Sequence, residues 1–404
     1  MTEKSKNQIL KQAEELIFPS GPTDAARKLG EAVTKYGLAK IIVALRELGF
    51  TKINPSFIGA ADMTVTRNEY RFKDGFGYGG LLSWGDGTQK LIILNARPNA
   101  CGLVCFGLEN YPDEERFLKK CERLSTTEMD IDGVKQKWDI TNGNHFILMG
   151  QIKPLVPETQ ILPPYFCIIH AGSAWKGSNQ FGPGLYLEKS PQLQKWAREI
   201  QTPWGPIHVL LDEKAETYYQ FYKKGSSHAQ NTRVKYGEIL FDDVGYKVLC
   251  NHTHQGLWSM NELLLGCQKW ETNDGSSLFP VTLNPNSPAY LLKGTPNFNP
   301  AVIELEGWKE RALKYGVYDR LLTANLVPHG GGYALPQYED VAKVVEFKGR
   351  RFFFMRLQDS GRHEVLEYPT SSYRYRDRSV IERVWELGMG RPVAKLLPLL
   401  SLKV

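Results

Sequence analysis

Short β-like runs spread along most of the chain constrain its fold more than any other feature of the sequence. Seven apolar runs are separated by loops that contain glycine or proline, which is typical of strands. They cover residues 91–96, 101–106, 146–152, 165–172, 207–213, 289–294 and 351–357. The runs show no regular βαβ alternation and no repeat. The sequence therefore predicts an α+β protein, with a single large domain of mixed β-sheets and peripheral helices over residues 51–404.

Residues 1–50 have the pattern of helices rather than strands, and we interpret them as a helical N-terminal appendage. Ile9, Ala13 and Leu16 fall on one helical face, a Pro- and Gly-containing break follows, and Thr23 or Asp24 can cap a second helix. A structural role for this segment is favoured over a partner-docking surface. Five further helices are expected near residues 113–124, 190–200, 212–224, 260–267 and 379–387.

Composition narrows the class of protein without identifying it. The 404 residues are 42% hydrophobic and 23% charged, which excludes a disordered, collagen-like or coiled-coil chain. The net charge of +6 permits a polyanionic partner but does not require one. The N-terminus lacks the apolar core of a signal peptide, and no apolar stretch approaches the roughly 20 residues that span a bilayer. A cytoplasmic protein with no membrane partner is expected.

Four of the eight histidines stand in compact, glycine-bearing contexts after apolar runs, where a scaffold can present a side chain to a cleft. They are His145, His170, His252 and His329, and Cys101 precedes a glycine in a similar way. Each histidine alone is more often structural, but the group suggests a site. Imidazole and thiolate together suit a transition metal such as zinc. The other five cysteines are expected to be buried apolar thiols.

These motifs, taken in order, resemble those of the RtcB family of RNA-splicing ligases, which use GTP and manganese to join RNA ends. The resemblance spans about residues 70–404 and excludes the N-terminal helices. The matching elements are Cys101-Gly102, Gly143–Phe146, His170–Ser173, His252, His329–Gly332, Tyr375–Asp377 and Lys403. The resemblance implies an RtcB-like catalytic domain and a role in tRNA splicing or RNA repair.

The resemblance also implies a metal centre and a nucleophile. Cys101 would bridge two Mn²⁺ ions, with His145 on one and His170 plus His252 on the other, and Zn²⁺ is an alternative occupant by intrinsic affinity. His254 shares a turn with His252 and is a less favoured alternative ligand. His329 would attack the α-phosphate of GTP and form a covalent histidine–GMP intermediate. GMP would then pass to an RNA 3′-phosphate, which arises from a 2′,3′-cyclic phosphate, and a 5′-hydroxyl would displace it and join the ends.

Binding of the nucleotide would fall to other residues of the same motifs. Asn144 and the backbone of Gly330, Gly331 and Gly332 would hold phosphate oxygens, and Tyr375 and Lys403 would belong to the guanosine pocket. The implied partners are RNA, as tRNA halves or broken ends, and a small activator of the archease type.

The chain departs from the family pattern at several positions, and each departure affects a specific contact. Pro98 stands where the family has a metal-binding aspartate, which puts one of the two ions in doubt. Leu148 replaces a glutamate that reads guanine, so the preference for GTP over another nucleotide is open. Ala174 and Tyr333 replace arginines, and Thr253 replaces an asparagine.

Two other functions stay open at this point. In the first, the metals serve only to open or remove terminal phosphates, as in a phosphodiesterase or phosphatase that processes RNA ends. In the second, the chain is a catalytically lapsed RNA-binding homologue. The retention of Cys101 and all four histidines argues against the second, since a lapsed site has no physical need for soft ligands in polar loops.

Overall fold

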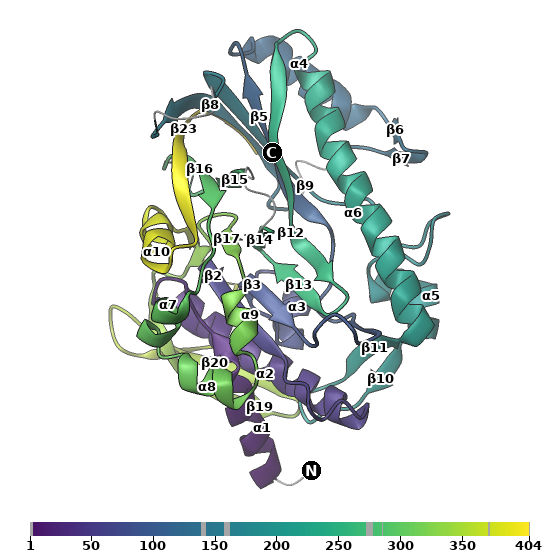
Figure 1. Ribbon diagram of the computed structural model, residues 1–404, viewed down its shortest axis with the longest axis vertical. Coiled ribbons are helices and arrows are strands. Elements are labelled where there is room, and N and C mark those ends of the chain that lie inside the picture. The colour runs from purple at the N-terminus through teal and green to yellow at the C-terminus, as the bar shows by residue number, and fades with distance from the viewer. Residues whose placement is uncertain are drawn as a thin grey trace.

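A large, almost entirely antiparallel sheet organises the structure. The computed structural model describes residues 3–138, 143–156, 162–271, 278–284, 286–370 and 372–403. Eleven strands form the large sheet in the order β1-β2-β3-β13-β12-β5-β9-β8-β23-β16-β15, and only the β1–β2 pair is parallel. Helices and smaller sheets surround it (Figure 1). The α+β class and the single mixed-sheet domain expected from the sequence are confirmed.

The strands of the large sheet come from every part of the chain. Across the sheet they are β1 (Ile17–Phe18), β2 (Ser56–Thr64), β3 (Tyr78–Ser83), β13 (Glu262–Leu265), β12 (Tyr246–Ser259), β5 (Cys101–Leu108), β9 (Tyr165–Ala171), β8 (Phe146–Pro154), β23 (Gly390–Leu402), β16 (Ala289–Gly294) and β15 (Leu278–Val281). Because neighbouring strands are distant in sequence, the sheet can bring separate motifs together.

Five small sheets and the helices complete the described part of the chain. The small sheets are β10 (Arg198–Ile200), β11 (Ile207–Leu211) and β4 (Leu91–Ile93); β14 (Cys267–Lys269) and β17 (Leu326–Pro328); β18 (Tyr333–Ala334) and β22 (Arg374–Tyr375); β19 (Tyr338–Phe347), β20 (Arg350–Leu357) and β21 (His363–Leu366); and β6 (Met129–Ile131) and β7 (Val134–Gln136). The helices are α1 (Glu3–Glu15), α2 (Ala25–Glu47), α3 (Glu69–Asp74), α4 (Glu114–Thr126), α5 (Pro191–Trp196), α6 (Asp212–Leu240), α7 (Pro300–Leu305), α8 (Lys309–Lys314), α9 (Tyr318–Leu322) and α10 (Ser379–Leu387), with a short 3₁₀ turn at Leu187–Lys189.

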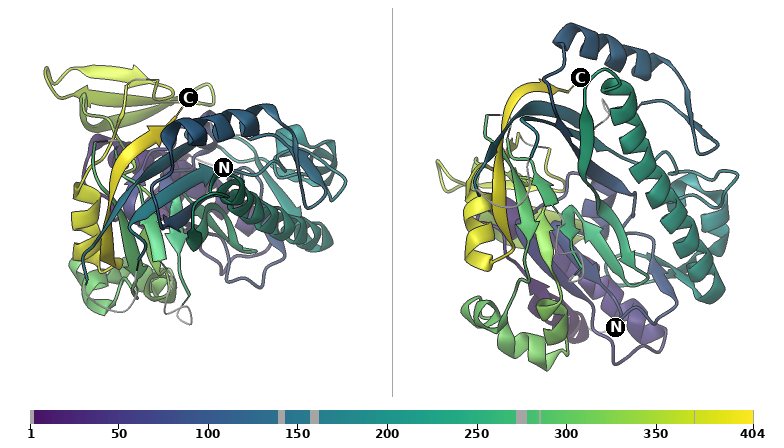
Figure 2. Two further views of the ribbon diagram at one scale, coloured as in Figure 1. Left: turned by 90° about the horizontal axis from the view of Figure 1, so that it is seen from above. Right: turned by 45° about the horizontal axis from the view of Figure 1, so that its top comes forward.

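The long helix α6 lies along one side of the sheet and packs on β5, β9 and β12, whereas the three-stranded sheet β19–β20–β21 projects from the body (Figures 1 and 2). None of the described helices has the length and apolar character needed to cross a membrane.

All seven predicted strand regions contain strands, but two predicted helices need correction. The helix expected over 260–267 is wrong: this stretch forms β13, which pairs with β12 on one side and β3 on the other. Leu263, Leu264 and Leu265 are all buried there, so a central strand, with both faces covered, accommodates three consecutive leucines. The helix expected over 190–200 ends at Trp196, and residues 198–200 form β10.

The N-terminal helices are present, and α2 packs against β2 and β19 rather than standing apart. Asp24, one of the two predicted caps, is the N-cap of α2. Its side chain accepts the backbone N–H of Arg27. The boundary proposed near residue 50 stays a prediction, although α2 contributes Tyr36, Leu38 and Ile41 to the largest hydrophobic cluster of the molecule.

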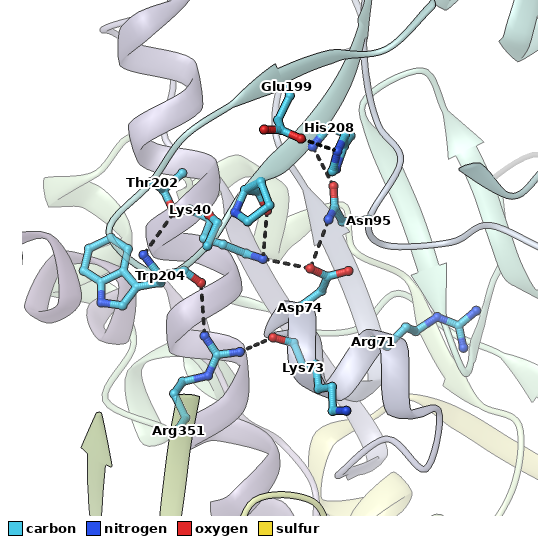
Figure 3. A network of polar contacts seen from close by, with 12 residues as sticks. Lys40, Arg71, Lys73, Asp74, Asn95, Glu199, Thr202, Trp204, His208 and Arg351 are labelled. Carbon is cyan, nitrogen blue, oxygen red and sulfur yellow. Dashed lines mark hydrogen bonds and ion pairs between the residues drawn. The ribbon is translucent and has the colours of Figure 1, made fainter. Parts of the chain in front are cut away.

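A buried ion pair joins α2 to Asp74, the last residue of α3 (Figure 3). Lys40 Nζ lies 2.9 Å from Asp74 Oδ1, and the Lys40 side chain is almost completely buried. Asp74 also accepts from Asn95 at 3.0 Å, so two donors satisfy its carboxylate. Burial lowers the pKa of Lys40, and the nearby Asp74 carboxylate opposes that shift. This polar contact therefore fixes how α2 sits on the sheet.

The backbone of α2 also comes very close to the turn that follows α3. A Cβ atom on Gly37 would lie 2.0 Å from the carbonyl oxygen of Gly75. Gly75 has a φ of +91°, in the left-handed region that favours glycine. Because the neighbour is backbone and not a flexible side chain, the two segments could not keep this distance if residue 37 carried a side chain.

We predict that Gly37→Ala lowers the free energy of unfolding by about 1–3 kcal/mol, as overpacking does. Helix propensity alone would raise it by about 1 kcal/mol, so the sign of the change separates the two effects. Urea denaturation followed by circular dichroism measures it. Gly177→Ala is the control, since its nearest neighbour lies 3.4 Å from the added Cβ. A stabilised Gly37→Ala protein would contradict the close packing.

Candidate metal centre and histidine cluster

The register of the central strands places the predicted site residues at one end of the sheet. Cys101 opens β5, and the next strands, β9 and β12, carry His170 and His252, both of which face Leu103 across their ladders. On the other side of β9, Phe146 pairs with His170, which puts the preceding residue His145 at the same place. Antiparallel pairing of strands distant in sequence therefore brings the motifs together.

Cys101, His145 and His170 form a compact buried cluster. The Cys101 Sγ lies 3.1 Å from His170 Nε2 and 3.4 Å from His145 Nε2. Their potential ligand atoms all lie within 4.8 Å of one another. One thiolate and two imidazoles at such distances can hold a transition-metal ion, and their chemistry suits a borderline-soft ion such as zinc.

A backbone contact orients one of these ligands. His170 Nδ1 lies 3.1 Å from the carbonyl oxygen of Asn144, so Nδ1–H donates there and Nε2 keeps its lone pair toward Cys101. Metal-binding histidines characteristically donate their second ring nitrogen to such a partner, which fixes the tautomer. Asn144, predicted to hold a phosphate, thus also supports the cluster through its backbone.

The electrostatics of the cluster favour the forms that bind metal. Burial raises the pKa of the Cys101 thiol, but the neighbouring His170 and His145 outweigh this and hold that pKa well below its ordinary value. Burial lowers the pKa of His170, which favours its neutral imidazole, and the neighbouring Cys101 opposes that shift. A thiolate and neutral imidazoles are the ligand forms that metal ions require.

The third histidine near this cluster is His254 and not the predicted His252. The His254 ring lies 4.9 Å from the His170 ring and 4.5 Å from the His329 ring, centre to centre. His252 instead has Nε2 2.8 Å from the carbonyl oxygen of Leu278 and stacks on Phe279 with ring centres 4.3 Å apart. The pairing of β12 with β5 shifts register between Thr253 and Gln255, at the position of His254.

The surroundings of His254 fit a ligand. The residue is completely buried, and within the described structure neither ring nitrogen makes a well-formed hydrogen bond. The pKa of His254 is lowered to about 3, first by burial and then by the nearby His329, while contact with Cys101 opposes the shift. Two unsatisfied polar atoms in a dry interior are costly, and an ion bound at the cluster would satisfy one of them. The assignment of His252 stays a prediction that the geometry does not favour.

His329 lies at the end of β17 against Asp62, a residue that the sequence analysis missed. The Asp62 Oδ2 atom is 2.7 Å from His329 Nδ1 and also accepts the backbone N–H groups of His329 and Gly330, at 3.0 and 3.2 Å. Nδ1–H therefore donates to the carboxylate, which leaves the Nε2 lone pair of His329 free to act as a nucleophile. An aspartate within the otherwise apolar run 57–63 was the signal that could have identified it.

A pocket beside His329 collects most of the residues predicted to bind the nucleotide. It has about 880 Å³ of empty space, including open solvent. Its lining includes Asn144, Leu148, His170, His329, Gly330, Gly331, Gly332, Tyr375 and Lys403. These residues come from β8, β9, the β17–β18 connection, β22 and the C-terminal end of β23, so only the fold brings them together.

The predicted phosphate contacts of the glycine backbone are only partly available. Gly330 N–H donates to Asp62, and Gly331 N–H donates to the carbonyl oxygen of Thr282 at 2.9 Å. Gly332 has a φ of +64°, and a Cβ there would lie 2.4 Å from the Asp62 carbonyl oxygen. The glycines therefore let the backbone pack under His329, and other donors must supply most contacts to a phosphate.

Next to Cys101, the Asn99 side chain makes a backbone contact. Its Oδ1 accepts the backbone N–H of Cys101 at 3.0 Å, and Pro98 offers no ligand atom in its side chain. The cysteines otherwise follow expectation, since all six are buried and free. Comparison with known proteins adds nothing to these observations, because no protein-family model and no curated protein matches the chain.

We predict that the protein binds a divalent transition-metal ion and that Cys101→Ser weakens this binding by at least about 100-fold, because the thiolate is the anionic ligand of the cluster. Competition with a chromophoric chelator measures the affinity. Cys121→Ser, which removes a buried thiol of α4, is the matched control and should bind the ion like the parent protein. Equal affinities in all three proteins would rule out the site.

We also predict that His254→Ala lowers the affinity for the ion by about tenfold or more, whereas His252→Ala changes it less than about threefold. The two substitutions remove the same side chain from one strand, so each is a control for the other. Titration of the metal-free proteins with Zn²⁺ and Co²⁺ measures both. Loss of binding in His252→Ala alone would restore the original assignment.

Proposed function

We propose that this protein is an RNA ligase of the RtcB type, which joins RNA 3′-phosphate or 2′,3′-cyclic phosphate ends to 5′-hydroxyl ends through a histidine–nucleotide intermediate. The observation that carries the proposal is the position of His329. Its Nδ1 is held by the buried Asp62 carboxylate, and its ring lies in the pocket next to the cluster of Cys101, His145 and His170. A nucleophile, a candidate metal centre and a nucleotide-sized pocket therefore meet at one place.

The first step forms one bond and breaks one. His329 Nε2 attacks the α-phosphorus of GTP, a phosphorus–nitrogen bond forms, and pyrophosphate leaves with the electrons of the α–β phosphoanhydride bond. Asp62 keeps the imidazole in the reactive tautomer and stabilises the positive charge that develops on the ring, the role of the aspartate in a catalytic triad. Lys403 and Tyr375 line the pocket and would contact the nucleotide.

In the second step the RNA 3′-phosphate attacks the phosphorus bound to His329, and the histidine leaves with the electrons of the phosphorus–nitrogen bond. The 5′-hydroxyl oxygen of the second RNA then loses its proton and attacks the activated 3′-phosphorus, a phosphodiester bond forms, and GMP leaves with the electrons of the phosphoanhydride bond. Cys101, His145 and His170 would hold a divalent ion, with His254 as the added ligand. When bound, that ion neutralises charge on phosphate oxygens. Mn²⁺ follows from the resemblance, and the sulfur and imidazole donors also suit Zn²⁺.

The guanine-reading glutamate of the family is absent, and this affects the expected nucleotide. Leu148 lines the pocket where that acceptor would stand. An apolar side chain discriminates between purines weakly, because no buried polar group loses a hydrogen bond when the other base is bound. We therefore propose that the enzyme accepts ATP as well as GTP, with a smaller preference than a pocket with a carboxylate would have.

We predict that incubation with labelled GTP or ATP and Mn²⁺ produces a covalent protein–nucleotide adduct that is absent from His329→Ala. The bond is a phosphoramidate, so acid should release the label and alkali should not. Gel autoradiography and intact-protein mass spectrometry detect it. His363→Ala removes an exposed histidine of β21 and should form the adduct normally. Adduct in His329→Ala would refute the nucleophile, and phosphate release from RNA ends without any adduct would favour a hydrolase.

We further predict that Asp62→Asn slows adduct formation by on the order of 100-fold or more, because an amide that donates to Nδ1 selects the unreactive tautomer. The rate in a single turnover measures this effect without the later steps. Asp359→Asn, in the exposed turn between β20 and β21, is the control for loss of one carboxylate. An unchanged rate in Asp62→Asn would show that the contact is only structural.

A further inference from the structure

A second pocket opens on the other side of Cys101 and His145. It has about 970 Å³ of empty space, including open solvent. Tyr78, Asn144 and Tyr333 line both this pocket and the one that contains His329, so these three side chains form the shared wall. The candidate metal centre therefore lies between two pockets, and only one of them is needed for the nucleotide.

Two arginines give the second pocket a positive charge. Arg71 lines it and is 4% exposed. Its Nε and Nη2 donate to the carbonyl oxygens of Ala96 and Arg97, at 3.0 and 2.7 Å. These acceptors are neutral, and among the described residues Arg71 has no carboxylate partner. A buried guanidinium with no carboxylate partner attracts an anion, since the interior screens little.

Arg67 lies at the rim of the same pocket. Its guanidinium carbon is 3.6 Å from the centre of the Tyr373 ring and 6.0 Å from that of Tyr333. Stacking on an aromatic face restricts the side chain and leaves the edge of the guanidinium free to donate to phosphate oxygens. Tyr373 with its stacked arginine also suits the unstacked terminal base of a single-stranded RNA.

We propose that this second pocket binds the terminal 3′-phosphate of the RNA, with Arg67 and Arg71 as its anion-binding residues. The inference rests on the proposed function, which requires a second phosphate-bearing substrate beside His329. A phosphate held in this pocket lies beside Cys101 and His145, which line it.

The test compares two fluorescent RNA oligonucleotides of one sequence that end in a 3′-phosphate or a 3′-hydroxyl. Anisotropy at fixed ionic strength, with no nucleotide present, measures binding. We expect the parent protein to prefer the phosphorylated end by about tenfold or more, and inorganic phosphate to compete. Arg67→Gln should abolish most of this preference, and Arg67→Lys should retain part of it, because lysine keeps the charge but not the bidentate geometry.

Arg123→Gln on the exposed face of α4 controls for the loss of one positive charge, and it should keep the preference of the parent protein. Arg71→Gln is a second variant, and its thermal unfolding separates a folding defect from a binding defect. A parent protein with no preference, or an Arg67→Gln protein that retains it in full, would overturn the proposal.

The two proposals fail in distinguishable ways. If the adduct at His329 forms but the 3′-phosphate gives no preference, the pocket assignment is refuted and the ligase proposal stands. If the preference is present and depends on Arg67 but no adduct forms, the binding site stands and the nucleotidyl-transfer step is refuted.

Discussion

The contact between Asp62 and the loop that carries His329 is the interaction on which the site depends. One carboxylate oxygen accepts three N–H groups, two from the backbone and one from the imidazole, and the aspartate is completely buried in β2. A buried carboxylate needs such donors to offset its lost hydration. The same atom therefore fixes the path of the glycine-rich loop and the tautomer of the histidine.

The strand that holds Asp62 is itself anchored by the N-terminal part of the chain. The Asp24 carboxylate, which caps α2, receives Arg376 Nε and Nη2 at 2.6 and 2.9 Å. Arg376 Nη1 donates in turn to the carbonyl oxygen of Met63 at 3.0 Å. Because Arg376 follows Tyr375, which lines the pocket beside His329, α2 connects through one buried arginine to both Asp62 and that pocket. The N-terminal helices thus contribute to the geometry of the site without lining it.

The local patterns of the sequence were sufficient for most elements and for part of the site. Apolar runs bounded by glycine or proline located all seven strand regions, and the helices expected over residues 113–124 and 379–387 correspond closely to α4 and α10. The run 260–267 was misassigned because consecutive leucines fit a buried strand as well as a helix, and only its two neighbouring strands decide between them. Motif context identified Cys101, His145, His170 and His329, which the fold gathers at one end of the sheet.

Asp62, His254 and the two arginines of the second pocket could not be chosen in this way. His252 and His254 share a strand and a motif, and the choice between them follows from the irregular register of β12 against β5. Asp62 can be linked to the site only through its contact with His329, which is 267 residues away in the sequence. The sequence by itself determined the kinds of groups available: thiol, imidazole, carboxylate and guanidinium. The tertiary structure decided which of them meet, because pairing between distant strands sets the distances on which ligation, tautomer and charge depend.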